Sequence, residues 1–240
     1  MDNVKKSIYN EKNWHGIQLT EKQCSQFDRY YELLNEWNKV MNLTAITDYD
    51  EVVLKHFIDS LSLVRVLDLS SVHSLIDVGT GAGFPGIPIK IAFPHINVTL
   101  LDSLNKRVKF LDTVISELKL DDISAVHGRA EDLAKKAEYR EKSDCCVSRA
   151  VANLATLSEY CLPFVRCGGN FVSYKSGSSD EEIREAEKAV KILGGKIEKI
   201  DKFVLPGSDM GRALVKISKK VSTPKKYPRK AGVPGKEPLK

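Results

Sequence analysis

From Ser74 onward the sequence alternates short apolar segments with helical segments, and this alternation constrains the fold more than any other feature. Strands are expected at 74–79, 97–103, 123–128, 143–150 and 169–175. Helices between successive strands indicate parallel pairing through right-handed crossovers, which is a doubly wound α/β sheet. Two further strands, at 196–205 and 212–218, are separated only by PGSDMG. This link is too short for a crossover, so we expect the sheet to end in an antiparallel hairpin.

The residues before Ser74 have a helical pattern instead. Thr20 and Gln23 form the signature of a capping box, and apolar residues follow at spacings of three and four. A second helical stretch is expected at 50–67, before a short linker at Ser70 and Ser71. We therefore expect a helical extension at 1–70, an α/β domain at 71–220 and a tail at 221–240.

The tail carries the positive charge of the chain. Between Lys219 and Lys240 there are eight Lys or Arg residues and one Glu, giving +7, whereas the rest of the chain sums to −2. Its four prolines favour an extended conformation over a helix. Two interpretations remain open at this point: a solvated tail, or a segment that binds a polyanion.

Several classes of protein are not supported by the sequence. No run of 18 apolar residues exists, and the N-terminal residues lack the apolar core of a secretory signal. The five cysteines have no metal-binding or disulfide spacing, so they are expected to be reduced core residues. We expect a cytoplasmic protein with no membrane segment and no metal.

A glycine-rich loop, DVGTGAGFPG, follows the first expected strand and lies where α/β proteins bind ligands. Gly81, Gly83 and Gly86 satisfy the dinucleotide-binding pattern G-x-G-x-x-G. Asp77, Gly79, Gly81 and Gly83 instead resemble the first motif of class I S-adenosylmethionine-dependent methyltransferases. The sheet of that class also ends in an antiparallel hairpin, which favours the second interpretation: a class I, Rossmann-like methyltransferase with seven strands.

Other residues fit a cofactor slot beside this loop. Asp102 ends the second strand, 23 residues after Gly79, where a carboxylate can bind both ribose hydroxyls, although such a residue is also a common helix cap. Ala130 and Glu131 follow the third strand and would border the adenine, or merely begin a helix. Phe84 would supply an apolar wall.

Two cations end later strands and are the candidate catalytic residues. Arg149 ends the fourth strand and Lys175 the fifth, so each is expected to face the cleft and to position a phosphate or a base, unless it is a structural ion-pair partner. No Asn/Asp-Pro-Pro-aromatic motif follows the fourth strand, and no cysteine lies in a loop there. These two observations point to an acceptor with its own lone pair, such as purine N7, which needs no general base.

Over nearly the whole chain the sequence resembles the RsmG (GidB) family of bacterial 16S rRNA guanine-N7 methyltransferases. The resemblance is carried by these segments: NLTAI, KHFIDSL, DVGTGAGFPGIPI, LLDSLNKR, GRAED, SRAVA and TPKKYPRKAGVPGKEPL. It implies S-adenosylmethionine as cofactor and the small ribosomal subunit as partner, with guanine 527 in the 530 loop as the modified nucleotide. It also implies cofactor contacts by a set of matching residues: Gly79, Phe84, Ala130, Glu131 and Arg149. The sequence differs from the family pattern at one place: after the fifth strand it has YKSG, where many relatives have Lys-Gly.

The basic tail suits an RNA partner. Its candidate RNA-binding residues are Lys225, Lys226, Tyr227, Arg229 and Lys230, with the tyrosine available for stacking. His56 and Asp59 lie one helical turn apart and are expected to pack as a hydrogen-bonded pair, with acceptor contact as the alternative. A monomer is expected. The rival functions are a small-molecule methyltransferase, which would not need the tail, and a non-catalytic rRNA-binding assembly factor, which would not bind the cofactor.

Overall fold

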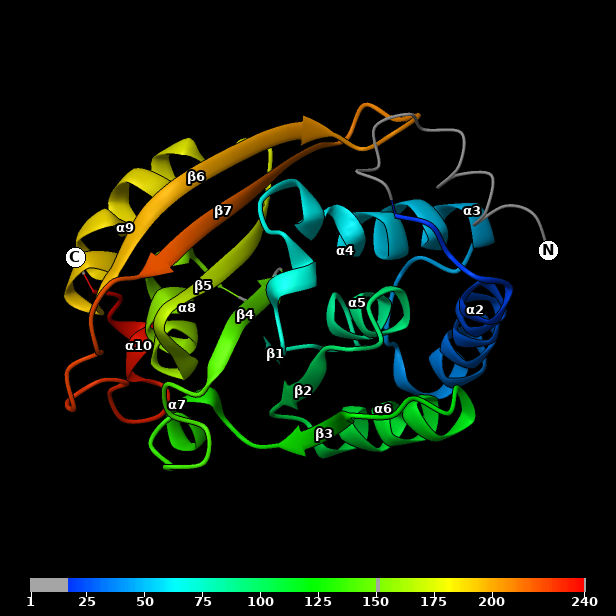
Figure 1. Cartoon of the computed structure of the whole chain (residues 1–240), viewed down its shortest axis with the longest axis horizontal. Coiled ribbons are helices and arrows are strands. Elements are labelled where there is room, and N and C mark those ends of the chain that lie inside the picture. The colour runs from blue at the N-terminus through cyan, green and yellow to red at the C-terminus, as the bar shows by residue number, and fades with distance from the viewer. Residues whose placement is uncertain (1–16, 150–151, 240) are drawn as a thin grey trace.

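The computed structural model describes residues 17–149 and 152–239, so the expectation of no secretory signal lies largely outside the described residues. Its centre is one sheet with strand order β3-β2-β1-β4-β5-β7-β6 (Figure 1). β1 to β5 are parallel, and β7 runs antiparallel to both β5 and β6, which confirms the predicted hairpin. The strands are β1 (Ser74–Val78), β2 (Asn97–Asp102), β3 (Ile123–His127), β4 (Ser143–Arg149), β5 (Val165–Ser176), β6 (Gly195–Val204) and β7 (Gly211–Lys219).

Helices cover both faces of this sheet (Figure 1). They are α2 (Glu21–Met41), α3 (Tyr49–Val52), α4 (Asp59–Leu61), α5 (Gly86–Ala92), α6 (Asn105–Glu117), α7 (Ala130–Leu133), α8 (Leu154–Cys161), α9 (Asp180–Ile192) and α10 (Val233–Lys236). The capping box of α2 is confirmed, because the Thr20 hydroxyl accepts from the Gln23 N–H and the Gln23 side chain accepts from the Thr20 N–H. The second helical stretch is present, but a π-helical segment at Val53–Ile58 joins α3 to α4.

Adjacent strand residues point into two different hydrophobic cores, as the alternation of side chains along a strand requires. Leu75 lies in one core with Phe27 of α2 and Phe110 of α6. Ile76 lies in the other with Leu157 of α8. The N-terminal helices therefore share a core with the sheet. Within the described ranges no helix is long and apolar enough to cross a membrane.

The tail is not extended throughout, as its prolines favoured, and the solvated alternative does not hold for all of it. Residues 233–236 form a turn of helix, α10, which contacts α8. Tyr227 and Pro234 are buried, and Tyr227 belongs to the core on the α8 side of the sheet. The physical reason is that tyrosine and proline supply apolar surface, and removing this surface from water lowers the free energy of the folded protein. Of the cysteines, Cys167 is exposed instead of buried.

Candidate active site

The glycine loop turns sharply between β1 and α5. Gly79 and Gly83 have φ values of 72° and 98°, which L-residues with side chains rarely adopt. A Cβ on Gly83 would lie 2.5 Å from Ile87 Cδ1 and 2.6 Å from the Tyr30 hydroxyl. That hydroxyl in turn donates a hydrogen bond to the Ala82 carbonyl. Gly83 is therefore needed for packing of the loop against α2 and α5.

Asp77 holds this loop through hydrogen bonds from Thr80 and Gly86. Its Oδ2 accepts from the Thr80 hydroxyl at 2.6 Å and from the Gly86 N–H at 2.8 Å, while its buried Oδ1 has no hydrogen-bond partner. Burial raises the pKa of this carboxyl to about 6, although both hydrogen bonds and the charge of Arg149 act in the opposite direction. Because the side chain is completely buried, the structure gives Asp77 a role in shaping the loop.

Asp102, at the end of β2, holds the same loop at Gly81. Its Oδ2 accepts from the Gly81 N–H at 2.9 Å, and its Oδ1 accepts from the Leu104 N–H at 2.9 Å. Arg107 lies 3.4 Å from Oδ2, and the residue as a whole is only 2 % exposed. A carboxylate has about four acceptor positions, so these contacts leave room for a ribose hydroxyl.

A first cavity of about 320 Å³ opens beside the loop. Gly79 lies on one side of it, and Ala130 and Glu131 at the start of α7 lie on another. The remaining lining residues are Val78, Leu101, Ser103, Gly128, Arg129, Tyr160 and Gly232. The structure thus brings together three of the predicted cofactor residues from two separate segments, the loop after β1 and the start of α7. Gly81, Gly83, Phe84, Asp102 and Arg149 do not line this cavity.

A second cavity, of about 560 Å³, lies at the end of β4. Arg149 and Lys175 line it together with His56 and Asp59 of the N-terminal helices. The other lining residues are Ile46, Lys55, Tyr174, Ser176, Met210 and Arg212. Both candidate catalytic cations therefore share one cavity, but it is separate from the one lined by Gly79 and Glu131.

Phe84 forms an aromatic and cationic cluster beside the second cavity. The His56 ring stacks on it with centroids 4.5 Å apart, and the Arg149 guanidinium lies 5.1 Å from its ring centre. Tyr30 packs against the same ring at 5.4 Å. The cluster joins the glycine loop to the N-terminal extension.

Asp59 and His56 do not form the expected hydrogen-bonded pair. Asp59 instead pairs with Arg149 at 2.8 Å and with Arg212 at 3.1 Å, one arginine on each carboxylate oxygen. The His56 Nε2 lies 2.9 Å from the Thr44 hydroxyl, and its Nδ1 lies 3.4 Å from Arg149. Burial, together with the charge of Arg149, lowers the pKa of His56 to about 4. Two guanidinium groups outcompete a neutral imidazole for the carboxylate.

Lys175 is mostly engaged within the protein. Its ammonium lies 2.6 Å from the Glu182 carboxylate and donates to the Ala152 carbonyl at 2.7 Å. The structural ion pair that the sequence left open is thus present. Because Lys175 also lines the second cavity, its role toward an acceptor stays a prediction.

The predicted RNA-binding residues separate into two groups. Lys225, Lys226 and Lys230 are exposed, as a phosphate-binding role requires. Tyr227 is 7 % exposed, so its ring is not presented for stacking on a base, contrary to expectation. Arg229 forms an ion pair at 2.7 Å with Glu159, a completely buried residue.

Sequence reasoning missed residues that reach the cavities from distant segments. Tyr160 and Gly232 line the first cavity, and Arg212 and Tyr174 line the second.

One signal in the sequence indicated a buried ion pair beside Tyr160. Glu159 is a lone acid in the apolar segment LATLSEYCLPF, which is typical of such a pair. Its partner, 70 positions away, could not be read from the sequence.

The strand order, the glycine loop and the cavity at the strand ends define a class I methyltransferase fold. Solved structures agree. The P. horikoshii TYW2 structure in complex with MeSAdo aligns with a TM-score of 0.52 at 15% identity, covering 68% of this chain and 61% of its own. The M. jannaschii TYW2 structure in complex with AdoMet aligns with a TM-score of 0.51 at 10% identity, covering 85% and 79%. At these identities the likeness concerns the fold alone.

Sequence comparison narrows the class to one family. The sequence profile described as GidB, rRNA small subunit methyltransferase G, matches residues 23–210. The ribosomal RNA small subunit methyltransferase G of Lachnoclostridium phytofermentans is 56% identical over 93% of both chains. The protein of the same name from Clostridium botulinum is 51% identical over 99% of this chain and 98% of its own. The chain therefore belongs to the rRNA small subunit methyltransferase G family, and it is a methyltransferase.

Within residues 17–149 and 152–239, no group of three or more His, Cys, Asp or Glu side chains is arranged to hold a metal ion.

Proposed function

We propose that this protein transfers the methyl group of S-adenosylmethionine to N7 of a guanine in 16S rRNA, in the 530 loop of the small ribosomal subunit. Its place of action would be the cytoplasm, where the subunit is found. The proposal is carried by two cavities at the carboxyl ends of neighbouring strands. Val78, which ends β1, lines the first cavity, and Arg149, which ends β4, lines the second.

The residues of the first cavity fit S-adenosylmethionine. Gly79 offers bare backbone, and the buried carboxylate of Glu131 offers an acceptor for the polar edge of an adenosine. Asp102, whose chain neighbours Leu101 and Ser103 line the cavity, keeps spare acceptor capacity for a ribose hydroxyl. When bound, the cofactor supplies a methyl group on a cationic sulfur. Asp77, Gly81 and Gly83 would contribute to cofactor binding by shaping the loop. Phe84 and Arg149 would contribute from the side of the second cavity.

The second cavity suits a nucleobase as methyl acceptor. Its lining combines an aromatic residue, Tyr174, with the cations Arg149 and Lys175. A cation that donates to guanine O6 would orient the neighbouring N7, because both atoms lie on the same edge of the base. We therefore assign Arg149 and Lys175 as positioning groups for the acceptor.

The charge state of the second cavity supports a reaction without a general base. Both oxygens of Asp59 are taken by arginines, and His56, with a pKa of about 4, is a weak base. Guanine N7 carries a free lone pair and loses no proton when it is methylated. Alignment of N7 with the methyl group would then be the main contribution of the protein.

The N-terminal extension supplies part of the acceptor cavity, through Ile46 in the loop between α2 and α3 and through Lys55, His56 and Asp59. We propose that the extension at 1–70 builds the acceptor side of the 71–220 methyltransferase domain. In the 221–240 tail, Lys225, Lys226 and Lys230 would contact phosphates of the RNA.

The test is to incubate the protein with methyl-labelled S-adenosylmethionine and small ribosomal subunits from cells that lack the activity. Naked 16S rRNA and free nucleosides are the parallel substrates. Label on a single guanine N7 in the 530 loop is the expected result. Label on nucleosides alone, or no label on any RNA despite intact cofactor binding, would contradict the proposal.

A further inference from the structure

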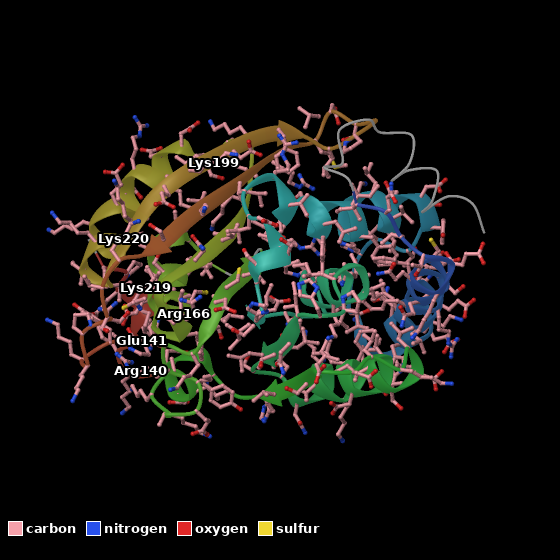
Figure 2. The ribbon with its side chains drawn as sticks, in the orientation of Figure 1. Arg140, Glu141, Arg166, Lys199, Lys219 and Lys220 are labelled. Carbon is pink, nitrogen blue, oxygen red and sulfur yellow. The ribbon has the colours of Figure 1, made fainter. Side chains whose placement is uncertain are left out.

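The C-terminal segment 223–239, here called the strap, is hydrogen-bonded to the rest of the protein at its first residue, Thr223. The Thr223 N–H donates to Glu141 Oε1 at 2.7 Å, and the Thr223 hydroxyl donates to the Leu193 carbonyl at 2.7 Å. Lys219, buried at the end of β7, pairs with Glu141 at 3.1 Å and donates to the Thr223 hydroxyl at 2.6 Å. Arg140 donates to the Thr223 carbonyl at 2.8 Å. Figure 2 shows Arg140, Glu141 and Lys219 gathered near the end of β7.

A second anchor lies in the middle of the strap. The Arg229 guanidinium donates to both oxygens of Glu159, at 3.0 Å and 2.7 Å, and the Arg229 N–H donates to the same carboxylate at 2.7 Å. Glu159 belongs to α8 and is completely buried. Every hydrogen bond to its carboxylate among the described residues comes from Arg229. Because an unpaired buried charge is costly, the strap is held closely on α8.

The far part of the strap reaches the first cavity. The Gly232 N–H donates to Glu131 Oε1 at 2.9 Å, and Gly232 itself lines the cavity together with Tyr160. The Pro234 carbonyl accepts from the Thr156 hydroxyl at 3.0 Å, which fixes the strap just beyond Gly232. The Glu131 carboxylate is thus aimed by a backbone group about one hundred positions away in the chain.

From these contacts we propose that the strap is part of the cofactor site. Gly232 acts as a positioning residue that orients the Glu131 carboxylate and forms a wall at the adenosine end. Arg229, through Glu159, holds Gly232 in place. The inference rests on the proposed function, since it concerns the same site, and it adds a second role to a segment whose lysines would contact RNA.

The test is calorimetric titration of the full chain with S-adenosylhomocysteine and, separately, with 5′-methylthioadenosine, which lacks the amino-acid end. Gly232→Ala places a side chain at φ +84°, with open space around the added Cβ. Gly207→Ala is the matched control, because Gly207 has φ +67° and equally open surroundings in the β6–β7 turn. Arg229→Lys keeps the charge beside Glu159 but loses the paired hydrogen bonds.

Gly232→Ala is expected to raise the Kd of both ligands about fivefold or more, because a side chain at this positive φ strains the backbone and shifts the N–H that donates to Glu131. Gly207→Ala should stay within about twofold of the wild type, with Arg229→Lys in between. Equal affinity of all variants, or an effect on S-adenosylhomocysteine alone, would overturn the strap inference while leaving the proposed function intact. Failure of the wild-type chain to bind either ligand would instead reject the proposed function.

Discussion

The half-buried His56 and the buried Asp77 have pKa values shifted in opposite directions, so removal of either one should expose a pH dependence that is cancelled in the wild-type protein. His56 has a folded-state pKa of about 4, below its usual 6.5. Between these values the unfolded chain binds a proton that the folded protein does not, so His56 lowers stability as the pH falls. Asp77 has a folded-state pKa of about 6, above its usual 3.8. In that window the folded protein binds the additional proton, so Asp77 raises stability as the pH falls.

The two contributions have similar size. One unit of pKa difference corresponds to about 1.4 kcal/mol, so acidification from about pH 7 to 4.5 should cost about 2 kcal/mol through His56. Over the same interval the protonation of Asp77 should raise the free energy of unfolding by about 2 kcal/mol. The wild-type free energy of unfolding should consequently change little in this range as far as these two residues are concerned.

The assay is urea denaturation at several pH values between about 7 and 4.5 for the wild type, His56→Gln and Asp77→Asn. His56→Gln should become more stable on acidification, because only the Asp77 effect remains. Asp77→Asn should become less stable on acidification, whatever constant cost its buried amide adds. His73→Gln, which removes an exposed histidine, is the control and should follow the wild type. If both site variants run parallel to the wild type, the opposing titrations are refuted.

Three further outcomes are expected. Asp102→Ala should weaken cofactor binding by about 1–3 kcal/mol, since it frees the Gly81 N–H and removes a ribose acceptor; near-wild-type affinity in calorimetry would reject the ribose assignment. Arg229→Ala should lower the free energy of unfolding by about 3–5 kcal/mol, and by more than Glu159→Ala, because it leaves the fully buried partner unpaired; urea denaturation measures the order. Replacing Lys225, Lys226 and Lys230 with glutamine should reduce the slope of log affinity against log salt for an RNA fragment by about 2, with unchanged cofactor affinity. An unchanged slope would remove these residues from the RNA contact: Lys225, Lys226 and Lys230.

The fold was predictable because its signals are local. The change from helical spacing to short apolar strands at Ser74 lies within one stretch of sequence, as does the hexapeptide link that excludes a crossover. The capping box of α2 involves residues three positions apart. Each of these features depends on backbone sterics and on the burial of neighbouring side chains, so tertiary contacts were not needed to read them.

The site was predictable only in part, because its side chains are fixed by partners far away in the chain. Gly79, Ala130 and Glu131 line one cavity because strand ends necessarily meet at one edge of the sheet. Asp102 and Asp77 have the expected positions, but their carboxylates hold the loop, which depends on where backbone N–H groups point. Nothing in a single sequence indicates that Arg149 is paired with Asp59, 90 positions away.

Asp59 shows why the second cavity is built by the whole chain and not by one of its expected parts. Its carboxylate lies between Arg149 at the end of β4 and Arg212 at the start of β7. It is 3 % exposed, so its charge is compensated mainly by these two arginines. Removal of either one would leave an under-compensated buried carboxylate. The N-terminal extension therefore sets the position of Arg149, and an acceptor base positioned by Arg149 would be positioned indirectly by Asp59.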